Sequence, residues 1–321
     1  MKFRQLGKTG LKVSEICLGT MQFGRWIDQT QSREVLNSAI DYGCNFIDTA
    51  DIYSSSQSAS DNDSEVILGN WLAQQGSQRQ ELIIATKVRG RTGPSPNDQG
   101  LSRAHIIQAA ERSLRRLRTD YIDLYQVHWP DEETRLEETL RAFDDLITSG
   151  KVRYIGCSNF PAWLLVKSLW ISDVRGYAGF ESVQPHYNYV HRAEFERELQ
   201  PLCQDMGIGV IPYSPLGGGF LTGKYRPEDP LPNSPRANKV KHRYLNERGF
   251  MALDALEKVG RNHGATIAQT AVAWLLANDF VSSVIVGANT VSQLTETADG
   301  VKVELTNQEK EMLDQQTDWK E

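Results

Sequence analysis

Four polar residues lie at or shortly after the ends of short apolar segments of the sequence. Asp48 and Lys87 close two such segments, His128 directly follows a third, and Tyr53 lies five residues beyond Asp48. If these segments are parallel strands of one barrel, their carboxyl ends meet on one face, where this architecture places its catalytic groups. We therefore expect the four side chains to lie close together.

Together these side chains suit acid–base chemistry on a carbonyl group. An ammonium close to a phenol favours the phenolate, so Lys87 is expected to lower the pKa of Tyr53 from about 10. The Asp48 carboxylate would keep Lys87 charged and fix its position. Tyr53 then becomes a proton donor near neutral pH, worth roughly 10²–10⁴ in rate. His128 can donate a hydrogen bond to the same oxygen, which suits a carbonyl that accepts a nucleophile and then a proton.

Each of the four residues also has a structural interpretation. An Asp at the end of a strand often caps the next helix, and a single Lys after an apolar strand is commonly a surface residue that extends to solvent. A lone His or Tyr is more often a hydrogen-bonded structural group than a catalyst. Their joint occurrence on neighbouring strand ends favours the chemical interpretation.

The elements that must position these residues are eight short β-type segments. They lack the polar–apolar alternation of a sheet with one wet face, and continuous apolar strands are typical of a parallel sheet covered on both sides. The segments are 16–19, 46–48, 82–87, 122–127, 154–157, 182–184, 208–212 and 284–286.

Amphipathic segments separate these strands and predict helices, for example over 102–118 and over 134–149, where Gly150 follows as a stop signal. Eight such units in 321 residues fit a (β/α)₈ barrel. A doubly wound sheet would usually carry Gly-x-Gly-x-x-Gly after its first strand. The turn at 19–24 lacks the middle glycine, so the barrel is favoured.

The whole chain, 1–321, is predicted to be a single domain. Residues 3–14, with a turn at 7–10, are expected to form a β-hairpin that caps the bottom of the barrel. Two long loops, 54–64 after the second strand and 226–238 after the seventh, fall where a barrel builds its active site.

Composition excludes several classes of protein. A charged fraction of 24%, a hydrophobic fraction of 40% and a net charge of −6 describe a globular protein without the basic face of a nucleic-acid binder. There is no signal peptide pattern and no apolar run of the roughly 18 residues that a membrane helix needs. The four widely spaced cysteines predict free thiols in a reducing compartment, without a disulfide frame or a metal site. We therefore expect a cytoplasmic protein.

Six blocks of residues stand at or just after the ends of the predicted strands. They are Phe46-Ile47-Asp48-Thr49-Ala50-Asp51-Ile52-Tyr53, Ala85-Thr86-Lys87, Gln126-Val127-His128-Trp129, Gly156-Cys157-Ser158-Asn159-Phe160, Gln184-Pro185-His186-Tyr187-Asn188 and Tyr213-Ser214-Pro215-Leu216. Taken together, these blocks resemble the signature of the aldo-keto reductases, in the branch of bacterial reductases and potassium-channel β-subunits. The resemblance runs in order from about residue 3 to residue 318.

The resemblance implies a catalytic tetrad and a nicotinamide site around it. The tetrad would be Asp48, Tyr53, Lys87 and His128, with Tyr53 as the general acid and His128 orienting the substrate. Further residues match positions around the nicotinamide: Ser158, Asn159 and Gln184 for its carboxamide, Tyr213 stacked on its ring, and Gly19, Thr20, Met21 and Asp48 lining the same end.

A glycine-rich segment, 216–224, follows the seventh strand and would allow the backbone to approach an anion closely. Gly218 to Lys224 also satisfies the pattern of a P-loop up to its last position. Tyr225 stands where that motif requires Ser or Thr, and Pro227 and Pro230 follow where it requires a helix. An NTPase site is therefore disfavoured.

The resemblance also assigns the rest of the cofactor. Lys224 and Arg236 would face its phosphates, while Asn289, Gln293 and Glu296 would reach its adenosine end, at a helix N-terminus suited to anions. Ser214, Leu216, Gly218 and Gly287 complete the predicted contacts. Many relatives carry Arg or Lys in place of Asn289 and Asn in place of Thr297. NADPH is the expected cofactor, because Lys224 and Arg236 can pair with a 2′-phosphate, and NADH stays open.

The expected substrate pocket is apolar and aromatic, and the expected substrate is a small aldehyde or ketone. Its residues would be Phe23, Trp26, Tyr53, His128 and Trp129, with Tyr189 as a further candidate. The polar loop 54–64 is either a flap beside Tyr53 or a plain solvated loop.

The leading function is an NADPH-dependent reduction of aldehydes and ketones to alcohols, without a metal. The alternative is a nicotinamide-binding regulatory subunit of the same fold with little turnover. A subunit of this kind would be expected to carry a long N-terminal extension that reaches a membrane partner; none is seen in this sequence, so the enzyme is the favoured expectation. The physiological substrate, the favoured direction and the oligomeric state stay open.

Overall fold

The fold is built on a parallel β-sheet, in a computed structural model that describes residues 1–54, 63–227 and 229–319. Within these ranges eight strands are hydrogen-bonded in the order β10-β3-β4-β5-β6-β7-β8-β9, and two more form a separate antiparallel pair. The strands are β1 (Phe3–Gln5), β2 (Lys12–Ser14), β3 (Ile16–Gly19), β4 (Phe46–Asp48), β5 (Ile83–Val88), β6 (Ile122–Val127), β7 (Val152–Ser158), β8 (Phe180–Gln184), β9 (Gly209–Val210) and β10 (Val284–Val286).

The sheet curls so that its two ends meet. The N–H of Ser282 donates to the carbonyl of Val210 at 2.8 Å, and the N–H of Ile285 donates to the carbonyl of Pro212 at 3.0 Å. These bonds join β9 and the residues after it to β10 and the residues before it, which are the two ends of the strand order. The predicted (β/α)₈ barrel is therefore confirmed, although the seventh predicted strand, 208–212, is regular only over Gly209–Val210.

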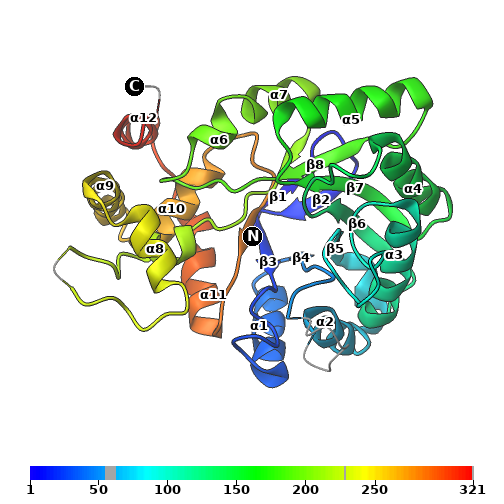
Figure 1. Cartoon of the computed structure of the whole chain (residues 1–321). Helices are drawn as coiled ribbons and strands as arrows, with labels where there is room; N and C mark the ends of the chain where they lie inside the picture. Colours follow the sequence, from blue (N-terminus) through cyan, green and yellow to red (C-terminus); the bar gives the residue numbers. More distant parts are fainter. Residues whose placement is uncertain (55–62, 228, 320–321) are drawn as a thin grey trace.

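Helices surround the strands, as Figure 1 shows. The predicted helices over 102–118 and 134–149 are confirmed as α3 and α4, and Ser102 caps the first of them by accepting the N–H of His105. The helices are α1 (Gln29–Asp41), α2 (Ser64–Leu72), α3 (Arg103–Leu117), α4 (Leu136–Thr148), α5 (Ala162–Arg175), α6 (Ala193–Glu196), α7 (Leu199–Met206), α8 (Ala237–Tyr244), α9 (Glu247–Asn262), α10 (Ile267–Leu276), α11 (Val291–Ala298) and α12 (Asn307–Gln316), with 3₁₀ turns η1 (Gly76–Glu81), η2 (Gly217–Thr222) and η3 (Asp299–Lys302).

The antiparallel pair β1–β2 closes the bottom of the barrel, as predicted. Leu6, between the two strands, and Val13, on β2, have no exposed surface. They pack in one hydrophobic cluster with alternate residues of the barrel strands, among them Cys17, Phe46 and Leu124. Because side chains alternate across a strand, this cluster identifies which residues of each strand point into the barrel.

The free-thiol prediction is also confirmed, because all four cysteines are buried and none is in a disulfide. Across the part of the chain described, we find no helix with the length and apolar character required to span a membrane.

A buried ion pair fixes β5 from outside the barrel. Glu65 of α2 is 1% exposed. Its Oε1 accepts the hydroxyl of Thr86 at 2.6 Å, and its Oε2 accepts Nε of Arg116, on α3, at 2.7 Å. Thr86 directly precedes Lys87, so two helices and the strand that carries Lys87 are held in one arrangement.

Candidate active site

The site lies at the carboxyl ends of the barrel strands, where inward side chains form a polar layer. Phe46 on β4 and Ile83 and Ala85 on β5 belong to the inward cluster. Two residues further along each strand, the same face carries Asp48 and Lys87, since side chains alternate with a period of two. The interior of the barrel is therefore apolar along the strands and polar at their carboxyl ends.

Lys87 is the centre of this layer. Its side chain is completely buried, and its Nζ donates to Oδ2 of Asp48 at 2.5 Å, to the carbonyl of Thr49 at 2.8 Å and to the phenolic oxygen of Tyr53 at 3.2 Å. The three acceptors satisfy the three protons of an ammonium group. The alternative of a lysine extending to solvent is excluded by this burial.

The charge states of this trio follow from burial and mutual attraction. Burial lowers the pKa of Lys87, but Asp48 and Tyr53 outweigh it, so that the pKa is raised and the ammonium persists. Burial, helped by the nearby charges of Asp48 and Asp51, raises the pKa of Tyr53 by more than Lys87 lowers it. The expected lowering of the Tyr53 pKa below its ordinary value is therefore wrong: desolvation of the phenolate dominates, and Tyr53 is a protonated phenol at neutral pH.

The second oxygen of Asp48 is held by two glutamine side chains. Nε2 of Gln184 donates to Oδ1 of Asp48 at 2.9 Å, and Nε2 of Gln126 donates to the same atom at 3.1 Å. Gln184, expected near a nicotinamide carboxamide, thus uses its amide to orient Asp48. Gln126 received no role from the sequence, although its place on β6, two residues before His128, is a usable signal.

His128 lies beside Tyr53 and is a neutral imidazole. Burial, Lys87 and Arg89 together lower its pKa to about 2. Its ring stands edge-on to the ring of Tyr53, with 5.7 Å between the centroids, and stacks on Trp129 at 3.7 Å. Its Nδ1 has no hydrogen-bond partner among the described residues. A neutral imidazole beside a phenol can donate a second hydrogen bond to the oxygen atom that accepts the phenol's hydrogen bond.

A second hydrogen-bonded group occupies the ends of β7 and β9. The Ser158 hydroxyl donates to the carbonyl of Gln184 at 2.8 Å, and Nδ2 of Asn159 donates to the carbonyl of His128 at 2.9 Å. The Tyr213 hydroxyl donates to Oδ1 of Asn159 at 2.9 Å. Ser158, Asn159 and Tyr213 therefore lie next to the tetrad, and their contact with a nicotinamide stays a prediction.

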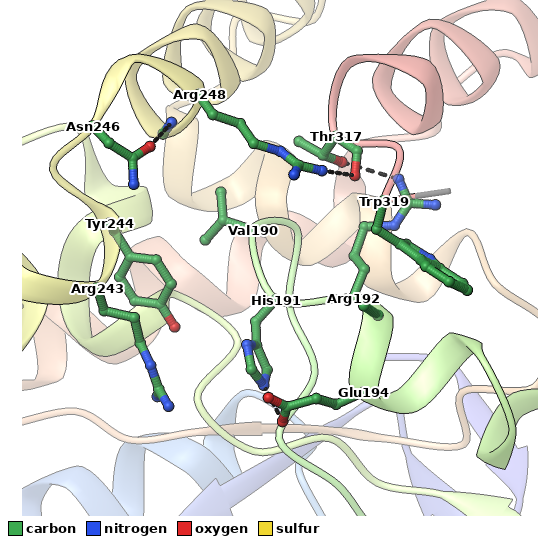
Figure 2. Close-up of a pocket in the computed structure, with 12 residues that line it drawn as sticks. Val190, His191, Arg192, Glu194, Arg243, Tyr244, Asn246, Arg248, Thr317 and Trp319 are labelled. Carbon is green, nitrogen blue, oxygen red and sulfur yellow. Dashed lines mark hydrogen bonds and ion pairs between the residues drawn. The ribbon is translucent and has the colours of Figure 1, made fainter. Parts of the chain in front are cut away.

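Behind Tyr213, two imidazoles continue the stack. His186 is parallel to Tyr213 at 5.2 Å, and His191 stacks on His186 at 4.0 Å. His191 also lines a cavity of about 270 Å³ between the segment before α6, helices α8 and α9, and the C-terminal segment (Figure 2). None of the tetrad residues lines this cavity, so it is separate from the polar layer.

The glycine-rich segment forms a tight turn between two cations. Gly217, Gly218 and Gly219 have φ values of 57°, 71° and 98°, a conformation that favours glycine. A side chain at Gly219 would lie 3.3 Å from Nζ of Lys224, and one at Gly218 would lie 3.7 Å from Cδ of Arg236. No helix follows this turn directly in the described chain, since α8 begins at Ala237, which agrees with the rejection of a P-loop.

Arg236 also reaches the loop after β3. Its guanidinium carbon lies 4.7 Å from the ring of Trp26, and that of Arg25 lies 5.4 Å from the same ring. Burial and Arg25 lower the pKa of Arg236. Neither arginine forms an ion pair with an acid in the parts of the chain that the structure describes, so two like charges flank one indole.

The predicted adenosine-end residues lie at the N-terminus of α11. Oε1 of Gln293 accepts the N–H of Asn289 at 3.0 Å, and Glu296 is exposed one turn further on. Gln22, which the sequence did not single out, joins this region to the polar layer: its Nε2 donates to the carbonyls of Gly19 and Ala288, each at 2.9 Å. Its position directly after Met21 was the available signal.

Other residues of the predicted turn have structural bonds. The buried Thr20 donates its hydroxyl to the carbonyl of Asp48 at 3.1 Å. The carbonyl of Ser214 accepts Nδ2 of Asn188 at 2.9 Å, and Ser214 has a φ of 57°. These bonds place Thr20 beside the tetrad and hold the segment that leads to Leu216. Gly287 sits against Gln22, since a side chain there would lie 3.0 Å from its Oε1.

The aromatic residues expected in the substrate pocket separate into two groups. Trp129 is 39% exposed, and Trp26 is partly buried beneath its two arginines. Phe23 and Tyr189 have no exposed surface and belong to the hydrophobic core, so they are not accessible to a substrate in this structure. Most of the expected flap, 55–62, lies outside the described residues.

Comparison with known proteins agrees with this geometry. Residues 15–318 match the model of the aldo/keto reductase family. The chain is 38% identical to the Bacillus subtilis (strain 168) "Uncharacterized oxidoreductase YrpG" over 317 residues, covering 98% of this chain and 95% of that protein. It is 36% identical over 309 residues to a "Probable voltage-gated potassium channel subunit beta" of Arabidopsis thaliana, covering 94% and 92%. It is 35% identical over 333 residues to "Protein tas" of Escherichia coli (strain K12), covering 95% and 94%.

The chain therefore belongs to the aldo/keto reductase family, and its class is that of the oxidoreductases. Proteins of this family generally bind nicotinamide cofactors and act on small molecules.

The charge state of His128 generates a prediction about stability. Its folded pKa of about 2 lies below the ordinary value, so stability is fully present above about pH 6.5 and is lost as the pH falls towards 2. Between pH 7 and pH 5 this group alone should remove about 2 kcal/mol from the free energy of unfolding. Urea unfolding at pH 7 and at pH 5 measures this loss. The free energy of unfolding should fall between the two pH values by about 2 kcal/mol less in His128→Asn than in the wild-type protein. Equal declines in both proteins would show that His128 is not held neutral.

Proposed function

We propose that this protein reduces aldehydes and ketones to alcohols with NADPH as the hydride source. The observation that carries the proposal is the hydrogen bond of 3.2 Å between the buried ammonium of Lys87 and the hydroxyl of Tyr53. A protonated phenol fixed by a buried cation is a proton donor, and the neutral His128 beside it is a second donor for the same oxygen.

The residues present fit a dinucleotide that carries phosphates. The turn at 217–219 lets the backbone approach closely, and Lys224 and Arg236 stand on its two sides. Arg25 and Arg236 lie near one indole without a neutralising acid in the described chain, an arrangement that an anion would stabilise. The N-terminus of α11 supplies further N–H donors at the other end.

The chain's own residues have distinct tasks in this reaction. Tyr53 gives its proton to the carbonyl oxygen as that oxygen becomes an alkoxide, and Lys87 stabilises the phenolate left behind. His128 donates a hydrogen bond that orients the carbonyl, and Asp48 holds Lys87 in place. Bound NADPH would supply the hydride that the carbonyl carbon accepts, which with the proton completes the alcohol.

Tyr53→Phe should lower kcat for aldehyde reduction by about 10²–10⁴ and leave the Kd for NADPH within a factor of about two. The phenol supplies a proton and makes little contact with the cofactor in this scheme. Steady-state oxidation of NADPH with a panel of aldehydes measures the rate, and fluorescence titration measures the Kd. A variant that keeps most of the wild-type rate would remove Tyr53 from the role of general acid.

Lys224→Ala and Arg236→Ala should raise the Kd for NADPH by more than they raise the Kd for NADH. The two cofactors differ by the 2′-phosphate, and the loss of one charge-assisted hydrogen bond to it is worth about tenfold in affinity. Lys258→Ala, which removes an exposed cation of α9 outside this turn, is the matched control. Equal losses for both cofactors would mean that neither cation meets the 2′-phosphate.

The alternative of a regulatory subunit with little turnover makes the opposite prediction for the wild-type protein. Some relatives are named as potassium-channel β-subunits. If NADPH binds but no carbonyl compound raises its oxidation above background, the alternative is favoured and the reductase proposal fails.

A further inference from the structure

Arg89, two residues after Lys87, is an exposed cation at the mouth of the site without an ionic partner. Its charge is close enough to His128 to help lower the pKa of that imidazole. Its side chain makes no hydrogen bond or ion pair with any residue of ranges 1–54, 63–227 and 229–319. By contrast, Arg112 pairs with Asp98 of the same β5–α3 loop, and Arg116 pairs with Glu65.

The acid that Arg89 influences is already bonded to other groups. The charge of Arg89 helps to lower the pKa of Asp131. The Oδ2 of Asp131, however, already accepts the N–H of Leu101 at 2.7 Å and the Thr134 hydroxyl at 2.7 Å. Its Oδ1 accepts the N–H of Glu133 at 3.1 Å. The Asp131 carboxylate therefore stabilises its own loop and leaves the guanidinium of Arg89 free for another anion.

The backbone fixes Arg89 between the segment of Tyr53, the proposed general acid, and that of His128, the proposed hydrogen-bond donor. The carbonyl of Val88, directly before it, accepts the N–H of His128 at 3.0 Å. Gly90, directly after it, packs so closely against Ile52 that a side chain there would lie 2.2 Å from Cγ2 of that residue. Ile52 is the neighbour of Tyr53. Arg89 is thus anchored on one side to the segment of His128 and on the other to the segment of Tyr53.

This position is held at a conformational cost. Arg89 has a φ of 132°, in a region that residues other than glycine rarely adopt. Such conformations persist only where the surrounding structure enforces them, and they gather at functional sites. An arginine at a position suited to glycine is therefore a candidate for a functional side chain.

If Arg89 binds an anion, that anion is not expected to be a phosphate of the cofactor. The residues proposed for the phosphates, Lys224 and Arg236, follow β9, and the helix α11 follows β10. Arg89 follows β5, which lies on the opposite arc of the barrel, between β4 and β6. An anion beside His128 on this arc belongs to the molecule whose carbonyl His128 orients.

We propose that Arg89 forms an anion subsite at the mouth of the barrel and that the substrates are carbonyl compounds carrying a carboxylate. The inference rests on the reductase function proposed above. A guanidinium presents two parallel N–H groups that match the two oxygens of a carboxylate. With the carbonyl oxygen at Tyr53 and His128, the carboxylate is bound at Arg89.

The test compares 4-carboxybenzaldehyde with its neutral methyl ester, which share the same reacting aldehyde. Wild-type protein should reduce the carboxylate with the higher kcat/KM, and this preference should weaken at high salt because an exposed pair is screened. In Arg89→Gln the ratio of the two kcat/KM values should fall about tenfold, through KM for the carboxylate. Arg89→Lys should retain part of the preference, because it keeps the charge but not the two-pronged geometry.

Arg33→Gln, on the exposed face of α1, controls for the change in net charge and should keep the wild-type ratio. Arg89→Gly controls for folding: it should lose the preference yet melt no lower than wild type, since glycine suits the backbone at this position. A wild-type preference for the ester, an unchanged ratio in Arg89→Gln, or a clearly lower Tm for Arg89→Gly would overturn the subsite.

The two proposals fail in distinguishable ways. If both aldehydes are reduced at equal rates, the reductase function stands and the subsite fails. If neither is reduced, the reductase function fails, and calorimetric titration of 4-carboxybenzaldehyde into wild type and Arg89→Gln still tests the subsite. Equal affinities of the two proteins in that titration would overturn it.

Discussion

The contact between the Lys87 ammonium and the Asp48 carboxylate is the interaction on which the rest of the site depends. A cation with no exposed surface is tolerated only when its charge is neutralised and its protons are bonded. Asp48 supplies the charge, and the carbonyl of Thr49 and the hydroxyl of Tyr53 accept the remaining protons. The position of the phenol is therefore a consequence of how the lysine is satisfied.

The barrel makes this contact possible by placing inward side chains of neighbouring strands at one level. Asp48 is further held by Gln126 and Gln184, so that β4, β5, β6 and β8 share one hydrogen-bonded network. Outside the barrel, the buried pair of Glu65 and Arg116 secures the strand that carries Lys87. Polar networks of this kind are rigid when every member is bonded, and that rigidity positions the proton donor Tyr53.

Much of this arrangement follows from local sequence. Continuous apolar segments ended by Asp48, Lys87 and His128 predicted the strands and their common face. The hairpin followed from a turn signal, and the helices followed from the amphipathic spacing of apolar residues. The pKa of Tyr53 was predicted in the wrong direction, because a sequence reveals a neighbouring charge but not how completely a phenol is desolvated. Gln126, Gln22 and Arg89 were missed for a related reason: their roles depend on which carbonyl, carboxylate or backbone conformation lies opposite them.

The ionisation of Tyr53 tests the account most directly. In protein labelled with ¹³C at the tyrosine ζ carbon, and with the Tyr53 resonance assigned by comparison with Tyr53→Phe, a pH titration follows this phenol alone. We predict that Tyr53 stays protonated beyond its ordinary pKa of about 10, and that Lys87→Met raises the pKa further by removing the nearby positive charge. A phenolate signal near neutral pH, or a Tyr53 titration unchanged in Lys87→Met, would contradict the account.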